Sequence, residues 1–374
     1  MVLVFGGGNM QRCSVGSLAT IDLDAIGNNI EVISSVAQQS KIIAVVKADA
    51  YGHGSLVIAK ALEGKVHGYA VASLEEAVAL REGGIASPIL ILQGIFSSEE
   101  AKLAQIYKFW VVVHSFYQIQ SIKNADLTGR INCWLKVNTG LNRLGFSADE
   151  VTAALDSLRG SGKAEVPVLM SHMACADEPE HMSNLQQLEK LKSISKSLNI
   201  QISLANSAAL FSEQRYQQDW CRPGLSIYGC SPFKKITARS LDLKPVMTLS
   251  CKVISIQKVA KGQTIGYGGH WKAERGARVA ILGIGYADGY PRFSKGDAFV
   301  YINKKRARVI GAVSMDMMAI DITDIPTTTI GDFAEIWGEN ILLSEVADWS
   351  NLLCYELITR LHQRVTRKYI NNIG

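Results

Sequence analysis

Between residue 42 and about residue 230, short apolar runs alternate with longer amphipathic stretches. Runs without polar alternation are typical of strands that are buried on both faces. Eight such β/α units predict an α/β protein with an N-terminal (β/α)8 TIM barrel, and an open doubly wound sheet is the alternative. The runs span residues 42–46, 69–72, 89–92, 109–113, 131–137, 166–170 and 202–205, with a less distinct eighth run near 219–222.

Helical spacing of apolar residues marks the segments around these runs. A helix is predicted over residues 25–37, with Asp24 as its N-cap, because Ile26, Ile30 and Ile33 would form one apolar stripe. A second helix is predicted near residue 190. Its buried stripe is expected to consist of Leu185, Leu188, Leu191 and Ile194.

Beyond Pro245 the pattern changes to a rough alternation of apolar and polar residues, which is typical of strands with one exposed face. Glycine, asparagine and aspartate clusters between the apolar segments predict turns. Strands are predicted over residues 278–282, 299–302, 308–313 and 318–322. The expected organisation is an N-terminal segment (1–16), a TIM barrel (17–240) and a mostly-β C-terminal domain (241–374).

Composition narrows the class of protein. The 374 residues are 48% hydrophobic and 20% charged, as in a globular protein long enough for two domains. The formal net charge of +5 comes from residues spread along the chain, so nucleic-acid binding is not expected. We expect no membrane span and no signal peptide, since the apolar runs are too short. Seven cysteines without a Cys-x-x-Cys pair indicate reduced thiols and a cytoplasmic location.

Lys47 follows the first apolar run, at the strand end where a TIM barrel places catalytic groups. An amine beside an apolar interior has its ammonium form disfavoured, which lowers the amine's pKa and favours Schiff-base chemistry. Position alone leaves a second interpretation equally open, namely a lysine that leaves the strand for solvent.

The residues around Lys47 resemble a known motif. Residues 46–54, Val-Lys-Ala-Asp-Ala-Tyr-Gly-His-Gly, are similar to the lysine motif of alanine racemases, which are fold-type III enzymes dependent on pyridoxal 5′-phosphate (PLP). Seven further segments resemble that family in the same order along the chain. They are residues 138–145 (NTGLNRLG), 171–173 (SHM), 205–207 (ANS), 222–224 (RPG), 265–268 (IGYG), 285–292 (GYADGYPR) and 314–316 (SMD).

The resemblance implies a PLP-dependent racemase that interconverts L- and D-alanine and supplies D-alanine for peptidoglycan. The cofactor would form a Schiff base with Lys47. Asn206–Ser207 and Gly224–Leu225 follow the last two runs, where TIM barrels commonly bind phosphate, and the N–H groups of Gly224 and Leu225 are expected to be free to donate. The residues implied to hold the cofactor besides Lys47 are Tyr51, His172, Asn206, Ser207, Arg222, Gly224 and Leu225.

Two of these cofactor residues have implied roles at the ring. Arg222 matches the arginine that donates to the pyridine nitrogen. Because arginine stays protonated, the ring nitrogen would remain unprotonated, which limits the carbanion lifetime and side reactions such as transamination. His172 matches the histidine that packs on the ring.

The resemblance also implies residues for the substrate and for a second base. Arg143 would bind the alanine carboxylate, and Lys136 matches a position that is carbamylated in some family members. Tyr267 would be the second base, acting on the face of the planar intermediate opposite Lys47. The family forms homodimers in which one subunit completes the site of its partner. The residues implied to act in this way are Tyr267, Tyr286, Met315 and Asp316.

Three positions depart from the family pattern and leave substrate breadth open. Gln363 stands where some relatives carry a tyrosine near the phosphate, Asn138 replaces the commoner aspartate, and Thr366 replaces a proline. A broader-specificity racemase, a fold-type III decarboxylase and a non-catalytic PLP-binding protein are the alternative interpretations. A metal hydrolase is not favoured and no metal is expected, because the residues after His172 lack a standard zinc spacing.

Overall fold

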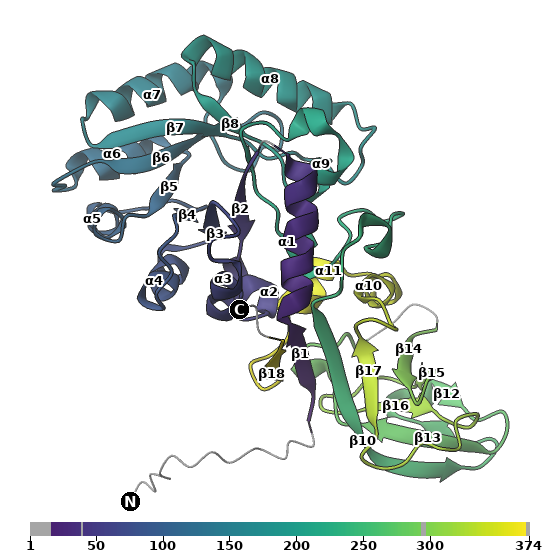
Figure 1. Cartoon of the computed structure of the whole chain (residues 1–374). Coiled ribbons are helices and arrows are strands. Elements are labelled where there is room, and N and C mark those ends of the chain that lie inside the picture. The colour runs from purple at the N-terminus through teal and green to yellow at the C-terminus, as the bar shows by residue number, and fades with distance from the viewer. Residues whose placement is uncertain (1–15, 39, 293–296, 372–374) are drawn as a thin grey trace, which may run out of the picture. The chain divides into compact units, whose positions relative to one another are not determined.

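The computed structural model describes residues 16–38, 40–292 and 297–371 (Figure 1). The chain divides into two compact units. The barrel unit comprises Ile21–Met247 together with two later segments, Leu353–Thr359 and Tyr369–Gly374. The β unit comprises Thr248–Leu352 together with Met1–Thr20 and Arg360–Lys368. The predicted N-terminal segment, residues 1–16, lies outside the described residues except for Gly16.

The strands of the barrel unit are parallel and close into a barrel in the order of the sequence. This confirms the predicted TIM barrel and excludes the open doubly wound sheet. Each strand overlaps one of the eight apolar runs, including the indistinct last one. The strands are β2 (Lys41–Val45), β3 (Gly68–Val71), β4 (Ile89–Ile91), β5 (Trp110–Val113), β6 (Ile131–Lys136), β7 (Ala164–Met170), β8 (Gln201–Ser203) and β9 (Trp220–Cys221).

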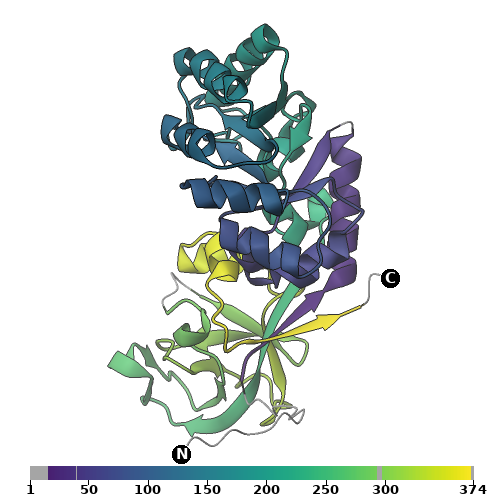
Figure 2. The same ribbon diagram turned by 90° about the vertical axis from the view of Figure 1, so that its left-hand side faces the viewer.

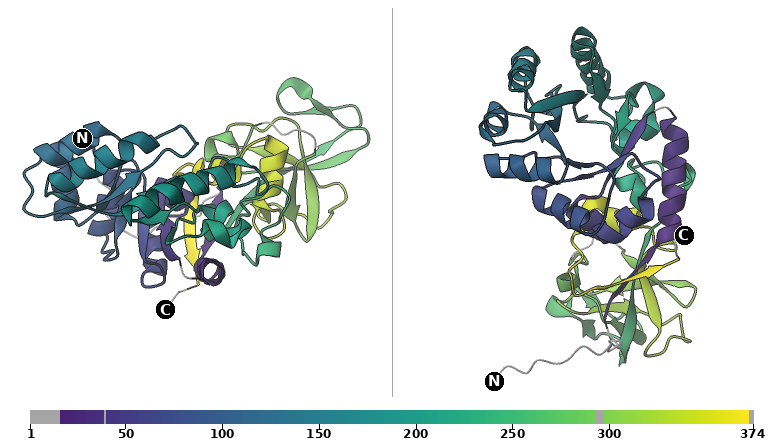
Figure 3. Two further views of the ribbon diagram at one scale, coloured as in Figure 1. Left: turned by 90° about the horizontal axis from the view of Figure 1, so that it is seen from above. Right: turned by 60° about the vertical axis from the view of Figure 1, so that its left-hand side comes forward.

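Helices α4 to α8 ring the outer side of the barrel strands (Figures 2 and 3). Among the described residues, none of the helices has the length and apolar character needed to cross a membrane. The helices of this unit are α1 (Leu23–Ala37), α2 (Lys47–Gly52), α3 (Ser55–Leu62), α4 (Leu74–Glu82), α5 (Ser98–Ile106), α6 (Phe116–Asn124), α7 (Val151–Gly160), α8 (Ser183–Leu198), α9 (Ser207–Ser212) and α11 (Cys354–Thr359).

Two predicted helix features are corrected by the structure. The N-cap of α1 is Asp22 rather than Asp24, because Oδ1 of Asp22 accepts hydrogen bonds from the N–H groups of Asp24 and Ala25 at 2.9 and 3.3 Å. Asp24 lies instead in the first turn, where its negative charge suits the helix dipole.

The buried face of α8 is partly polar. It consists of Asn184, Gln187, Leu188 and Leu191, whereas Leu185 is exposed. Gln187 donates to the carbonyl of His172 (3.0 Å) and to Thr139 (3.1 Å), so its amide positions the loops that follow β7 and β6. An apolar-periodicity rule misses this face because its polar members are buried in order to bind backbone groups.

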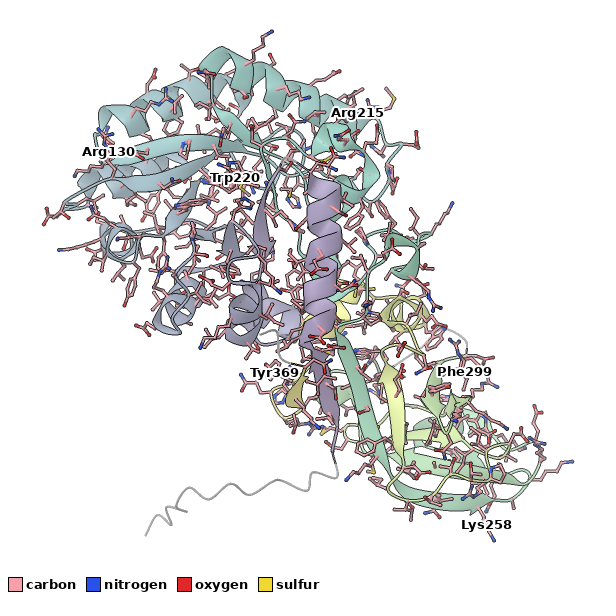
Figure 4. The ribbon with its side chains drawn as sticks, viewed as in Figure 1. Arg130, Arg215, Trp220, Lys258, Phe299 and Tyr369 are labelled. Atoms are coloured by element: carbon pink, nitrogen blue, oxygen red, sulfur yellow. The ribbon has the colours of Figure 1, made fainter. Side chains whose placement is uncertain are left out.

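Three tryptophan rings of the barrel strands pack on one another. Trp110 and Trp220 are the first residues of β5 and β9, and Trp134 of β6 packs on both, with ring centroids 5.2 to 5.8 Å apart. Trp220 is labelled in Figure 4. The rings occupy the side on which the strands begin. The opposite side, at the C-terminal strand ends, is left for the cavity described below.

The β unit is built on one sheet with the strand order β13-β16-β15-β14-β17-β10-β1-β18, and β13 also pairs with β10, so six strands form a ring. The elements are β1 (Leu18–Asp22), β10 (Met247–Val259), β11 (Thr264–Ile265), β12 (Trp271–Lys272), β13 (Ala277–Leu282), β14 (Phe299–Ile302), β15 (Lys305–Ile310), β16 (Met318–Asp321), β17 (Phe333–Trp337), β18 (Thr366–Ile370) and helix α10 (Leu343–Ser350). The mostly-β character predicted after Pro245 is confirmed.

The strand predicted over residues 308–313 begins three residues earlier, as β15 from Lys305. Asn303 and Lys304 have φ angles of 47° and 64° and form a two-residue hairpin turn, so Ile302 pairs directly with Lys305. The apolar pattern starts only at Arg308 because Lys305 and Arg306 are charged, although both are strand positions that face solvent.

Candidate active site

A cavity of about 470 Å³ lies at the C-terminal ends of the barrel strands. Residues that follow β2, β3, β4, β6, β7, β8 and β9 contribute to its wall, together with one residue of α11. Its lining comprises Val45, Lys47, Tyr51, Ala72, Leu92, Gln93, Lys136, Arg143, Leu144, Met170, His172, Asn206, Ser207, Arg222, Gly224 and Tyr355. Nine of the residues that the sequence singled out are therefore together in one cavity, and Leu225 is buried beside them.

Lys47 is the first residue of α2 and reaches the cavity directly from the end of β2. Burial lowers the pKa of its amine, and the positive charge of Arg143 lowers it further. Glu76 acts in the opposite direction and raises it. The side chain thus faces the cavity, and the interpretation of a lysine that leaves the strand for solvent is not supported.

The backbone after Lys47 takes an unusual course. Ala48, Asp49, Ala50 and Tyr51 all have φ between 52° and 54°, in the left-handed region. For residues with a side chain this conformation costs about 1–2 kcal/mol each. Such a segment persists only where surrounding contacts hold it, and segments of this kind concentrate at functional sites.

One end of the cavity is a cluster of hydroxyl and backbone N–H groups. Ser207 Oγ accepts hydrogen bonds from the N–H groups of Gly224 (2.9 Å) and Ser226 (3.3 Å) and from the Ser226 hydroxyl (3.0 Å). The expectation of a free N–H group at Gly224 is therefore not met in this structure, because Ser207 occupies it. Asn206 is the N-cap of α9, and its Oδ1 accepts the N–H of Ala209 at 3.0 Å.

A side chain on residue 224 would collide with its neighbours. A Cβ atom built on Gly224 would lie 2.5 Å from the Oη atom of Tyr51. Tyr51 is itself fixed, since it is 6% exposed and its ring packs against Tyr228 (4.8 Å between centroids) and Tyr355 (5.8 Å). The absence of a side chain at residue 224 therefore keeps the Tyr51 hydroxyl and the backbone close together at this end of the cavity.

Arg222 is buried, with 4% of its surface exposed. Its guanidinium donates to Ser203 Oγ and to the carbonyls of Ser171 (2.6 Å) and Leu204 (3.4 Å). Burial lowers its pKa to about 10, so the group remains protonated near neutral pH. These hydrogen bonds fix the positive charge of the Arg222 guanidinium in the cavity wall.

The cavity is strongly cationic. Lys47, Lys136, Arg143 and Arg222 all contribute to its wall, and none of the lining residues, every one of which lies in the described part of the chain, is acidic. Burial, followed by these four charges, holds the pKa of His172 well below its usual range, so the imidazole is neutral. A neutral ring against the cavity suits packing on a flat ligand, and the cations suit anionic groups.

Lys136 and Arg143 differ in exposure. Lys136 ends β6 and is 6% exposed, and burial followed by the charges of Arg222, Arg143 and Lys47 lowers its pKa to about 8. Arg143 is exposed at the cavity rim, where its guanidinium is accessible to a carboxylate.

Sequence reasoning missed Tyr355. This residue of α11 lines the cavity, whereas Gln363, which was compared with the phosphate-side tyrosine of some relatives, is an exposed residue of the β unit. Burial, with the nearby Cys230 and Cys354 thiols, raises the pKa of Tyr355 to about 12. The six-residue helix α11 returns to the barrel unit after the β unit, and a segment that short carries no periodic signal.

The four remaining predicted residues lie in the β unit, in three adjoining loops. Tyr267 is 72% exposed, Met315 53% and Tyr286 37%. The N–H groups of Tyr286 and Ala287 donate to the carbonyls of Ser314 (3.0 Å) and Met315 (2.9 Å), which joins two of the loops. A Cβ atom on Gly266 would lie 3.5 Å from the Ala312 nitrogen, which brings the Tyr267 loop beside them. Exposed apolar residues gathered in this way are typical of an interaction surface.

Asp316, which follows Met315, is held by an ion pair. Arg364 binds Oδ1 of Asp316 with Nη2 (2.7 Å) and Oδ1 of the buried Asp288 with Nε (2.8 Å). The carboxylate of Asp316 is thus engaged within its own unit, and the pairing fixes the loop that presents Met315.

The fold and the cavity place the chain among TIM-barrel proteins with a cationic cavity at the C-terminal strand ends, which is where enzymes of this fold carry their active sites. Two family models match it: the alanine racemase N-terminal domain over residues 21–232 and the alanine racemase C-terminal domain over residues 246–369. The chain belongs to the alanine racemase family.

Individual relatives agree with this assignment. The chain is 40% identical to the catabolic alanine racemase of Pseudomonas aeruginosa over 351 residues, which cover 94% of this chain and 98% of the relative. Its fold is similar to that of the biosynthetic alanine racemase of Pseudomonas aeruginosa, with a TM-score of 0.90, 40% identity and coverage of 95% and 99% of the two chains. It is also similar to the alanine racemase of Bartonella henselae, which is described with covalently bound pyridoxal phosphate (TM-score 0.85, 28% identity, 95% and 99% coverage).

Proposed function

We propose that the chain interconverts L- and D-alanine with PLP attached to Lys47 and with Tyr267 of a partner copy as the second base. The observation that carries the proposal is the gathering of Lys47, Arg222 and the hydroxyl cluster at Ser207 around one cationic cavity. The D-alanine so formed would serve peptidoglycan synthesis.

The residues of the cavity fit PLP at three separate points. Lys47, whose pKa is lowered by burial, suits the aldehyde. Ser207, Tyr51 and Tyr355 provide hydroxyl donors for the phosphate beside the glycine backbone at residue 224. Arg222 is a buried donor, held in place by hydrogen bonds from Nη1 and Nη2, and its cationic guanidinium suits the ring nitrogen. Bound PLP would supply electron withdrawal from the amino-acid Cα, which makes the Cα–H bond acidic.

The protein's own residues then bind and orient the amino acid. Arg143 at the rim would take the carboxylate through two parallel hydrogen bonds. Lys136, with a pKa of about 8, has a substantial neutral fraction at slightly alkaline pH and can react with carbon dioxide. The resulting carbamate would place a negative charge beside Arg143 and hold its guanidinium. His172, neutral and half-buried, would pack on the ring.

Racemisation needs a proton removed from one face of Cα and another returned to the opposite face. Lys47 would hold or accept the proton at Nζ on one face, and Tyr267 at Oη on the other. The exposure of Tyr267, Tyr286 and Met315 in the β unit supports a surface that closes over another copy's cavity.

The activity is tested on the purified protein with its cofactor. Borohydride reduction followed by peptide mapping should place PLP on Lys47, and the same sample should convert each alanine enantiomer into the other. Serine, lysine and arginine, assayed in parallel, measure substrate breadth, and rescue of a D-alanine auxotroph tests the peptidoglycan role. A protein that is colourless, or that is labelled elsewhere, would refute the proposal.

The shared site is tested by complementation. Lys47→Ala and Tyr267→Phe variants should each be inactive. If Tyr267 acts in the partner, random mixing of the two gives heterodimers with one intact site, and about a quarter of the wild-type activity returns. If each subunit used its own tyrosine, no mixture would regain activity.

A further inference from the structure

The left-handed segment that follows Lys47 is bound at its first residue by a side chain from another β/α unit. Glu76, in the first turn of α4, accepts a hydrogen bond from the N–H of Ala48 with Oε1 at 2.7 Å. Its second oxygen, Oε2, accepts the N–H of Ala72 at 2.6 Å. Ala72 lines the cavity, so one carboxylate joins the backbone beside Lys47 to the backbone of the neighbouring wall.

Comparison with the next helix, α5, shows which of the two hydrogen bonds to Glu76 belongs to helix capping. Helix α5 begins with Ser97 as its N-cap, and Glu100 accepts the N–H of Phe96 at 2.6 Å. Helix α4 repeats this arrangement, with Ser73 as its N-cap and with the N–H of Ala72 donating to Oε2 of Glu76. Capping therefore accounts for Oε2 of Glu76. It does not account for Oε1, which leaves the helix to bind Ala48.

The rest of the left-handed segment has its own bonds further along. The N–H of Ala50 donates to the carbonyl of Val46 (2.9 Å), and Oδ1 of Asp49 accepts the N–H of Ser55 (2.7 Å). The N–H of Ala48 is the position nearest to Lys47, and Glu76 supplies its acceptor. The course of the chain at Lys47 thus depends on a residue that does not itself line the cavity.

We propose that Glu76 is a positioning residue that acts through Lys47. By accepting the Ala48 N–H with the oxygen that the helix cap does not use, it fixes the backbone from which the Lys47 side chain enters the cavity. This inference rests on the proposed role of Lys47 as cofactor lysine and base.

The negative charge of Glu76 also affects the protonation of Lys47. The titratable groups around Lys47 in the described chain are the basic groups Arg143, Lys136 and Arg222, the neutral His172 and Tyr51, and the acidic Glu76. Glu76 raises the pKa of the amine. Loss of its charge would lower that pKa, so the neutral, basic form of Lys47 would be present at lower pH.

The test compares Glu76→Gln with Glu76→Asp in the PLP-loaded enzyme. An amide cannot accept both N–H groups, so we expect kcat of E76Q to fall 10- to 100-fold, with KM for alanine changed less than threefold because Arg143 is untouched. When the assay runs in the direction in which Lys47 removes the Cα proton, the acid limb of the kcat–pH profile of E76Q should move to lower pH. E76D, which keeps the charge but is too short to span both groups, should lose kcat with that limb unmoved.

Two matched controls separate this role from helix capping and from surface charge. Glu100→Gln removes the same cap in the next unit, and Glu75→Gln removes a charge from the adjacent exposed position of α4. Both should keep wild-type kcat within twofold and an unmoved pH profile. Amide hydrogen exchange of the peptide that contains residues 47–55 should accelerate in E76Q and E76D but not in the controls, which gives a readout independent of turnover.

The outcomes are distinguishable from failure of the proposed function. If borohydride labels Lys47 in E76Q while its kcat, pH profile and hydrogen exchange match those of the controls, the inference is overturned and the proposed function stands. If the wild-type protein is not labelled at Lys47, the proposed function fails, and the inference fails with it. Should E76Q not accumulate as folded protein, E76D with normal kcat and normal exchange would overturn the inference alone.

Discussion

Substitution of Gly224 by alanine tests the geometry of the proposed phosphate end. The new Cβ atom would lie 2.5 Å from Tyr51 Oη and 3.2 Å from its Cζ, whereas ordinary contacts begin at 3.4 Å. The hydroxyl must therefore retreat by about 0.9 Å (3.4 minus 2.5). The φ angle of Gly224 is −130°, so the left-handed region is not involved and the collision is with a side chain.

Tyr51 has little room to move, because its buried ring packs against Tyr228 and Tyr355. Overpacking of this kind costs about 1–3 kcal/mol in the free energy of unfolding. Loss of one charge-assisted hydrogen bond to phosphate costs about 1.5–3 kcal/mol, or roughly a 10- to 100-fold rise in Kd for PLP. We expect both losses in the Gly224→Ala variant.

The assay is titration of the apoenzyme with PLP, together with thermal unfolding. Gly160→Ala, at the end of α7 where a Cβ atom meets nothing within 4 Å, is the matched control and should bind PLP normally. A double variant with Tyr51→Phe removes the colliding oxygen, so stability should recover while PLP affinity does not. A Gly224→Ala protein with unchanged melting temperature and unchanged PLP affinity would refute the reasoning.

Three further outcomes are expected. Arg143→Lys should raise KM for alanine about tenfold with a smaller change in kcat, because a single ammonium cannot form the paired bonds to a carboxylate; steady-state kinetics would contradict this if kcat alone fell. Tyr355→Phe should weaken PLP binding by roughly tenfold in the same titration, and unchanged affinity would remove Tyr355 from the phosphate site. Lys136→Met should stabilise the apoenzyme in carbon-dioxide-free buffer, on the order of 3 kcal/mol below pH 8, because the folded-state pKa lies at about 8 against a reference of 10.5. The penalty for burying the charge disappears as pH rises from 8 to 10.5, so the gain in melting temperature should vanish over that window, and a constant gain would argue against the lowered pKa.

The barrel was predictable because its signal is local and repeated. Each strand is a short apolar run that is buried on both faces, and even the two-residue strand β9 coincides with a predicted apolar run. The position of Lys47 at a strand end followed from the same pattern, as did the clustering of Arg222 and Gly224 with it. The parallel strands bring all their C-terminal ends to one side, so residues far apart in sequence share one cavity.

The parts that sequence missed depend on contacts between distant segments. Tyr355 reaches the cavity because a short helix returns to the barrel unit, and Glu76 binds Ala48 from the neighbouring β/α unit. The polar face of α8 is buried for the same reason, since Gln187 binds loop backbone. Periodicity reports which residues avoid water, but it does not report which polar groups find partners inside the protein.

The positive groups of the cavity wall repel one another, so each needs a hydrogen-bond partner, a lowered pKa or a bound anion. An unpaired buried charge is costly, yet Arg222 and Lys136 are both buried beside further positive groups. Arg222 offsets that cost with hydrogen bonds to Ser203, Ser171 and Leu204, whereas Lys136 responds with a pKa of about 8. A phosphate, a substrate carboxylate and a carbamate would each supply a negative charge at a different point of the wall. The same repulsion that destabilises the empty cavity would therefore favour binding of the cofactor and the amino acid.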